Sequence, residues 1–150
     1  MISESKYFIA AHPEKKDFLQ VQWTFLSELE GILHLQLPIW RPGRYQAQYF
    51  AKNIPAVYQF LEGEKQLVSK KAGSVWEIRA KKGERIQLNW TYLAAQEDAG
   101  GSVVQADFLY INFINCCLYV VGCEEQDLEV QLSFPENWQY LSSLTHQVGQ

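Results

Sequence analysis

The sequence contains few cysteines, and their number is odd. The three cysteines are Cys116, Cys117 and Cys123. An odd count with two adjacent residues makes a poor disulfide framework and suits a reducing compartment. Adjacent residues of an extended strand point to opposite faces, so Cys116 and Cys117 are not expected to bind one metal ion together. We expect them to be buried structural residues. No basic residue lies near them in the sequence to lower a thiol pKa, which argues against a cysteine nucleophile.

Long hydrophobic runs are also absent. Residues 1–6 contain no apolar core of signal-peptide length, and no segment approaches the length of a membrane span. We therefore expect a cytoplasmic protein with no membrane partner. The net charge of −4 and the pI near 5.4 offer no concentrated basic face for phosphates, so nucleic acid is not an expected partner either.

The sequence also lacks the usual patterns of catalytic metal and phosphate sites. A gluzincin-type zinc site needs His-Glu-x-x-His on a helix. The three histidines lie far apart, at His12, His34 and His146. No metal ligand is therefore predicted in this chain. The pair Gly100-Gly101 has neither the spacing nor the following helix of a phosphate-binding loop.

Alternation of apolar and polar residues with a period of two dominates what is present. The most regular runs are 19–25, 33–37, 86–92 and 128–134, and less regular strands are expected at 7–12, 57–61, 74–79 and 118–122. Turn signals separate these runs at fairly even spacing, and only 45–52 is suited to a helical turn. Many short strands of this kind predict an all-β fold, an antiparallel β-sandwich forming a single domain over residues 1–150. Trp23, Trp76 and Trp90 fall on the apolar sides of their strands and are expected in the core.

The longest irregular stretch is 94–115. A long connection inside a compact domain is usually either disordered or functional, and its aromatic and asparagine residues argue against disorder. Its acidic residues are Glu97, Asp98 and Asp107. These carboxylates either pair as acid and base or cap a turn and solvate a loop.

The most specific stretch is a corner after the strand at 33–37. It is formed by Trp40, Arg41, Pro42, Gly43, Arg44 and Tyr45. Proline sets φ for the first central turn position, and glycine accepts the positive φ of the second, so Pro42-Gly43 predicts a sharp turn. The two arginines either grip a carboxylate and stack on the flanking rings, or pin the corner against a neighbouring strand or domain.

This corner resembles the signature of the N-terminal domain of the glycyl aminopeptidases, zinc metallopeptidases of the gluzincin type that usually also carry a PDZ domain. The run Leu-Pro-x-Trp-x-Pro-Gly-x-Tyr matches residues 37–45 at every stated position. The resemblance extends over about residues 7–144, with the tryptophan strand at 74–78 and the tyrosine strand at 90–95. Residues 98–115 look like the subgroup of this family found in Bacteroidetes.

The resemblance implies a non-catalytic accessory domain. In the parent enzyme a zinc ion would polarise water and the peptide carbonyl while a glutamate acts as general base, and N-terminal glycine or alanine would be removed from peptides. The zinc helix and the PDZ-like segment are absent from this chain, so the chain alone is expected to hold no cofactor and to catalyse nothing. Its expected partners are the catalytic domain of the same polypeptide, toward which residues 144–150 lead, and the peptide substrate. We also expect that the chain can form a dimer through the face that the catalytic domain would cover.

By analogy with other gluzincin aminopeptidases, a loop of this domain would supply polar contacts to the substrate amine. The candidate residues are Asp107, Tyr110, Asn112 and Asn115. The competing interpretation is that Asn112 and Asn115 bond only the backbone of their own turns.

A second hypothesis needs no parent enzyme. It describes a free-standing β-sandwich module that binds carbohydrate or protein, with an aromatic groove near Trp40 or Trp138, the two tryptophans that lie near turns.

Overall fold

Two β-sheets make up most of the chain in this computed structural model, which describes residues 1–38, 50–95 and 102–142. The larger sheet has the order β12 (Leu128–Ser133), β1 (Ile2–Ala11), β2 (Phe18–Ser27), β8 (Arg85–Leu93), β4 (Val57–Leu61) and β5 (Glu64–Leu67). The smaller has the order β11 (Tyr119–Val120), β3 (Gly31–Gln36), β7 (Val75–Ala80) and β6 (Ser69–Ala72). A separate hairpin joins β9 (Val103–Gln105) to β10 (Phe108–Tyr110), and the short helices are η1 (Phe50–Asn53) and α1 (Phe113–Cys116). The all-β prediction is confirmed.

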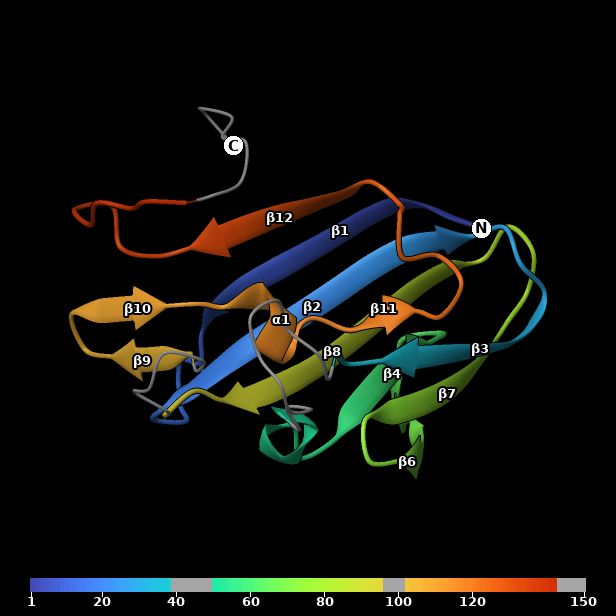
Figure 1. Ribbon diagram of the computed structural model, residues 1–150, viewed down its shortest axis with the longest axis horizontal. Coiled ribbons are helices and arrows are strands. Elements are labelled where there is room, and N and C mark those ends of the chain that lie inside the picture. Colours follow the sequence, from blue (N-terminus) through green and yellow to red (C-terminus); the bar gives the residue numbers. More distant parts are fainter. Residues whose placement is uncertain (39–49, 96–101, 143–150) are drawn as a thin grey trace, which may run out of the picture.

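The two sheets face each other across one core (Figure 1). Alternate residues of the central strands β2 and β8 are buried, which is the pattern of strands with one dry face. Trp23 and Trp90 from the larger sheet and Trp76 from the smaller one belong to the same buried cluster, so all three core predictions are confirmed. The ring of Tyr7 stacks on Trp23 with centroids 5.1 Å apart.

The strand pairs of the described residues are antiparallel with one exception. Strand β12 runs parallel to β1, with Val130 opposite Tyr7. The chain reaches this edge from β11 of the other sheet and not through a hairpin, and such a crossover permits parallel pairing.

The hairpin of β4 and β5 shows how a local turn builds a surface feature. Glu62 and Gly63 have φ of 53° and 81° and connect Leu61 to Glu64, as expected of a two-residue type I′ turn. The register that follows places Lys65 opposite Phe60 on the neighbouring strand.

The structure corrects several details of the sequence-based assignment. Strand β1 begins at Ile2, earlier than the expected 7–12, and β11 spans only Tyr119–Val120. The stretch expected to be irregular contains β9, β10 and α1. Cys116 ends α1 and Cys117 is its C-cap, so the pair does not occupy a strand with side chains on opposite faces. Of the expected helical turn at 45–52, only the part from Phe50 onward is described, and it is 3₁₀.

Candidate functional site

The predicted substrate contacts lie in one segment, residues 102–118, which we call the hairpin–helix segment. It holds β9, β10 and α1, and the hairpin lies at the end of the molecule opposite the N-terminus (Figure 1). Two buried aromatic side chains of the larger sheet anchor its base. The indole Nε1 of Trp90 donates a hydrogen bond to the carbonyl of Cys116 at 2.9 Å, and the hydroxyl of Tyr7 donates to the carbonyl of Leu118. The segment is therefore fixed to the inner face of the sheet.

Ser102 organises the middle of this segment. Its hydroxyl oxygen accepts a hydrogen bond from the backbone N–H of Asn112 at 3.0 Å, and the side-chain Nδ2 of Asn115 lies 3.5 Å from the same oxygen. Asn115 is 0% exposed, whereas Asn112 is half-buried. The bond at Asn112 uses its backbone N–H, and its side chain makes no capping hydrogen bond to α1. The side chain of Asn115 reaches the hydroxyl of Ser102. The interpretation that both side chains bond only the backbone of their own turns stays a prediction. Their contact with a substrate stays a prediction.

The tip of the hairpin is open to solvent. Asp107 lies in the turn between β9 and β10 and is exposed, and the rings of Phe108 and Tyr110 are 49% and 48% exposed. An exposed carboxylate can accept a hydrogen bond from an ammonium group, and an exposed phenol can donate one to a carbonyl. Of the four predicted contacts, Asp107 and Tyr110 are the two whose side chains face solvent without rearrangement.

The cysteines at the base of the segment are unsuited to nucleophilic chemistry. Cys116 is buried, and a side-chain hydrogen bond to Cys116 that favours the protonated thiol of Cys117, together with burial, raises the pKa of Cys117 well above its usual value. Burial also raises the pKa of Tyr7, with the nearby cysteines adding to the effect. A nucleophilic thiol needs a lowered pKa, so this environment favours a structural role.

The described residues do not fit a zinc site. No three His, Cys, Asp or Glu side chains gather into a possible metal-binding group within 1–38, 50–95 and 102–142. The Nδ1 of His12 accepts hydrogen bonds from the backbone N–H groups of Glu14 and Lys15, and the Nε2 of His34 lies 3.6 Å from a carboxylate oxygen of Glu77. Both histidines therefore already have protein partners of their own.

Several predicted residues lie outside the described ranges. They are the corner residues Trp40, Arg41, Pro42, Gly43, Arg44 and Tyr45, the loop acids Glu97 and Asp98, and the tail at 144–150. Trp138, proposed as a surface contact, is half-buried.

The fold and the anchored hairpin define the class of protein, a two-sheet β domain with an accessory segment at one end. The family model of the Peptidase M61 N-terminal domain matches residues 6–150, so the chain belongs to that family. Comparison with curated proteins finds no match. None of the helices described is long and apolar enough to cross a membrane.

Among solved structures, the chain is similar to the aminopeptidase N family protein from Idiomarina loihiensis. The TM-score is 0.71 at 21% sequence identity, and the match covers 88% of this chain and 22% of that one. At this identity the likeness shows the fold alone. The chain spans about a fifth of that protein's length.

Sequence reasoning missed the part that Ser102 plays, because nothing in its neighbourhood marks it out from other loop serines. It also missed an open cavity over the larger sheet, lined in part by Gln20, Gln22 and Asn89. These residues were recognised only as the wet face of their strands. Alternation gives the face of each residue, but the lateral alignment of residues requires the strand register.

Proposed function

We propose that this chain is the non-catalytic N-terminal accessory domain of a cytoplasmic zinc aminopeptidase that removes glycine or alanine from the amino terminus of peptides. The zinc ion and the reacting groups belong to a catalytic domain of the same polypeptide. The sequence resemblance to the glycyl aminopeptidases of Bacteroidetes supports the narrower part of this proposal.

The observation that carries the proposal is the family match over residues 6–150, nearly the whole chain. The fold-level likeness to one portion of a much longer aminopeptidase N family protein is compatible with it. Among the described residues, His12 and His34 already have partners within the chain, and the raised pKa of Cys117 does not suit a nucleophile.

Within this proposal the hairpin tip packs beside the catalytic cleft. Phe108 and Tyr110 present apolar rings that a neighbouring domain would cover. Asp107 would accept a hydrogen bond from the free amine of the peptide, with Tyr110 beside it. Asn112, which is half-buried, would complete the polar lining on the side of α1, and the buried Asn115 would support it through Ser102.

The first experiment measures hydrolysis of a glycyl arylamide by the purified chain, with and without a chelator. We expect no hydrolysis and no zinc bound after dialysis against the metal. Cleavage that a chelator abolishes would show that the chain itself is the enzyme. The mass of the native protein in its source cell, found with an antibody to this domain, should exceed 17.4 kDa several-fold.

The second experiment tests the hairpin tip in that larger polypeptide. Asp107→Asn should raise KM for a glycyl peptide roughly tenfold and leave kcat nearly unchanged, because a charge-assisted hydrogen bond to the bound amine is weakened. Asp127→Asn is the matched control, since Asp127 is also an exposed loop aspartate but lies between β11 and β12. Equal KM values for the two variants would remove Asp107 from the proposal.

A further inference from the structure

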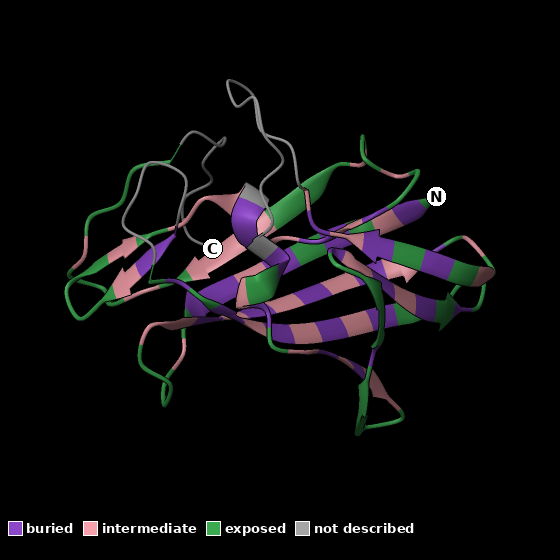
Figure 2. Cartoon of the chain, turned by 60° about the horizontal axis from the view of Figure 1, so that its bottom comes forward, coloured by how far each residue is buried: buried purple, intermediate pink, exposed green. Residues whose placement is uncertain are grey.

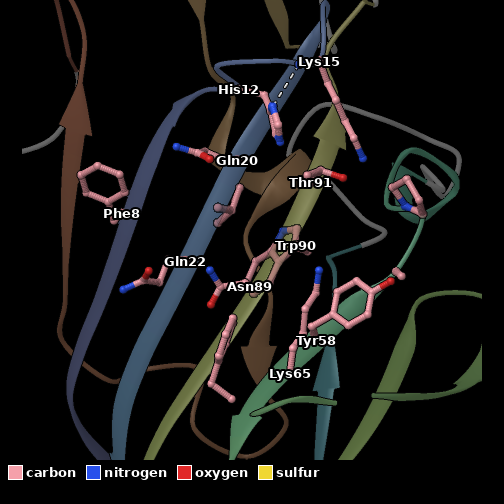
Figure 3. A pocket seen from close by; sticks show the side chains of 14 residues that line it. Phe8, His12, Lys15, Gln20, Gln22, Tyr58, Lys65, Asn89, Trp90 and Thr91 are labelled. Carbon is pink, nitrogen blue, oxygen red and sulfur yellow. Dashed lines mark hydrogen bonds between the residues drawn. The ribbon is translucent and has the colours of Figure 1, made fainter. Parts of the chain in front are cut away.

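An open cavity of about 370 Å³ lies over the outer face of the larger sheet, away from the hairpin–helix segment. We call it the outer groove. Its size falls within the range of small-molecule sites, roughly 300–1,000 Å³. Figure 3 shows side chains from the neighbouring strands β1, β2, β8, β4 and β5, together with His12 and Lys15 from the connection between β1 and β2.

Strand register aligns the floor of the groove. Phe8 lies opposite Gln22, Gln22 opposite Asn89, and Asn89 opposite Tyr58, so these four side chains form one row across four strands. Gln20 and Thr91 are opposite each other and lie two residues along their strands from this row. Because the ladders hold the backbone rigidly, the Cα positions that carry the polar side chains of the floor are set before any ligand arrives.

The floor offers hydrogen-bonding groups that the protein does not use. The side chains of Gln20, Gln22 and Thr91 make no hydrogen bond to any residue in the described ranges, and only Asn89 has a neighbour, with its Oδ1 3.4 Å from the Nε2 of Gln87. Amides and hydroxyls both donate and accept. This combination suits a ligand that carries many neutral hydroxyl groups.

Aromatic rings stand at both ends of the row. Phe8 and Tyr58 are half-buried, and Phe60 also lines the groove next to Tyr58 on β4. The apolar faces of such rings can pack against the flat C–H face of a sugar, while the amides between them bond its hydroxyls.

The charge of the groove is opposite to that of the chain. Its lining includes Lys15, Lys65 and His12 but no aspartate or glutamate, although the chain has a net charge of −4. Neither lysine forms a salt bridge with a carboxylate within the part of the chain that the structure describes. The Nζ of Lys65 lies 4.0 Å from the ring centroid of Tyr58, and that of Lys15 lies 5.8 Å from the ring centroid of Phe18. The cations are therefore held at the aromatic rings and remain available to an anion.

We propose that the outer groove binds an anionic saccharide, with its hydroxyls on the amide floor and its carboxylate or sulfate at Lys15 and Lys65. An inorganic anion would use the lysines and leave the amide floor empty. A neutral sugar would make no use of the two lysines or of the absence of carboxylates from the lining of the groove. The proposal does not depend on the function proposed above, because the groove and the hairpin–helix segment share no residue.

The test titrates the ¹⁵N-labelled chain with tetragalacturonic acid and with a sulfated tetrasaccharide, up to about 10 mM since a small open site binds weakly. Saturable shifts of amides on β2, β4 and β8 with either probe support the proposal and identify the acid group. The comparison probes are the methyl ester of the first tetrasaccharide, tetraglutamate and inorganic phosphate. Equal affinity for any of these three would overturn the proposal, as would the absence of saturable shifts with both acidic saccharides.

Variants separate the two halves of the site. The double variant Lys15→Gln, Lys65→Gln should weaken binding roughly tenfold and remove most of its salt dependence. Gln22→Ala should weaken binding several-fold and preserve the salt dependence. The matched control is Lys70→Gln, because the Nζ of Lys70 lies 5.1 Å from the ring centroid of Trp76 on the other sheet. Unchanged affinity in the first two variants, with their thermal unfolding intact, would overturn the assignment to this groove.

Discussion

The inner and outer faces of the larger sheet are built by the same strands but have different chemistry. On β2, Val21 and Trp23 point into the core, whereas Gln20 and Gln22 point outward. Figure 2 shows this alternation as buried and intermediate residues along the long strands. The inner face joins large aromatic rings into one packed cluster, while the outer face presents amides to solvent. Packing on the inner face thus fixes the strands, and with them the backbone positions that carry the amides of the outer face.

Removal of an inner ring should have the largest effect on stability. Trp23 is buried, stacks on Tyr7, meets Trp90 edge-on at 6.5 Å and donates its indole N–H to Ser5 at 2.9 Å. We expect Trp23→Ala to lower the free energy of unfolding by about 3–5 kcal/mol, because the cavity cannot close between two sheets. Urea unfolding followed by circular dichroism measures this loss.

The neighbouring outer residue is the control for that measurement. Gln22 differs from Trp23 by one position and by face, so Gln22→Ala should change the free energy of unfolding by less than about 0.5 kcal/mol. Similar losses of unfolding free energy for both variants would mean that the outer face contributes to stability as much as the inner face does.

High pH should weaken the inner face. Burial raises the pKa of Tyr92 to about 12, although a hydrogen bond from Asn53 lowers it and Cys116 raises it. Because this pKa exceeds its unfolded value near 10, the stability that the neutral phenol provides is complete below pH about 10 and is lost as pH rises through about 12. We expect the urea midpoint to fall over this window.

Tyr92→Phe is the variant that tests this assignment. It should cost about 1 kcal/mol at neutral pH, since the side chain of Asn53 loses the acceptor it holds at 3.2 Å. It should also flatten the fall of the urea midpoint above pH about 10. An unchanged alkaline slope in this variant would assign the effect to other groups with a raised pKa, such as Tyr7 and Cys117.

One amide side chain lies on the inner face of the larger sheet, among the apolar residues. Gln59 on β4 is buried on the inner side, opposite Leu88, and its Nε2 has no hydrogen-bond partner among the residues that the structure describes. Because a buried donor without a partner costs free energy, we expect Gln59→Leu to stabilise the chain by about 1 kcal/mol. Thermal unfolding compared with Gln66→Leu, an exposed neighbour on β5, gives the measurement. A destabilised Gln59→Leu would show that the amide has a role the inner face requires.

Alternation along the sequence was enough to predict which residues of β2, β3 and β8 face the core, but on β12 the apolar Leu128 is 55% exposed. Trp23, Trp76 and Trp90 were placed correctly, because burial on one face follows directly from a period of two. Strands β5 and β6 were missed, since all their residues are exposed and no alternation marks them. Their positions come from the turn at Glu62-Gly63 and from pairing with inner strands, which are tertiary effects.

The candidate sites were less predictable than the core. Asp107 and Tyr110 were singled out by resemblance and lie at an exposed tip, but the bonds that fix the segment come from Trp90 and Tyr7, far away in the sequence. The row from Phe8 to Tyr58 depends on the register of four strands. Register is set by the whole sheet, so no local pattern could have revealed the outer groove.

A small effect is also expected for an ion pair on the exposed part of the outer face. Arg85 and Glu4 lie 2.6 Å apart, but their side chains are 56% and 60% exposed, so water and salt screen the attraction. Arg85→Ala should therefore cost about 0–1 kcal/mol. A double-mutant cycle with Glu4→Gln isolates the pair from the other effects of each substitution. A coupling well above about 1 kcal/mol that persists in high salt would mean that the outer face also stabilises the fold, and that display and packing are not divided between the two faces.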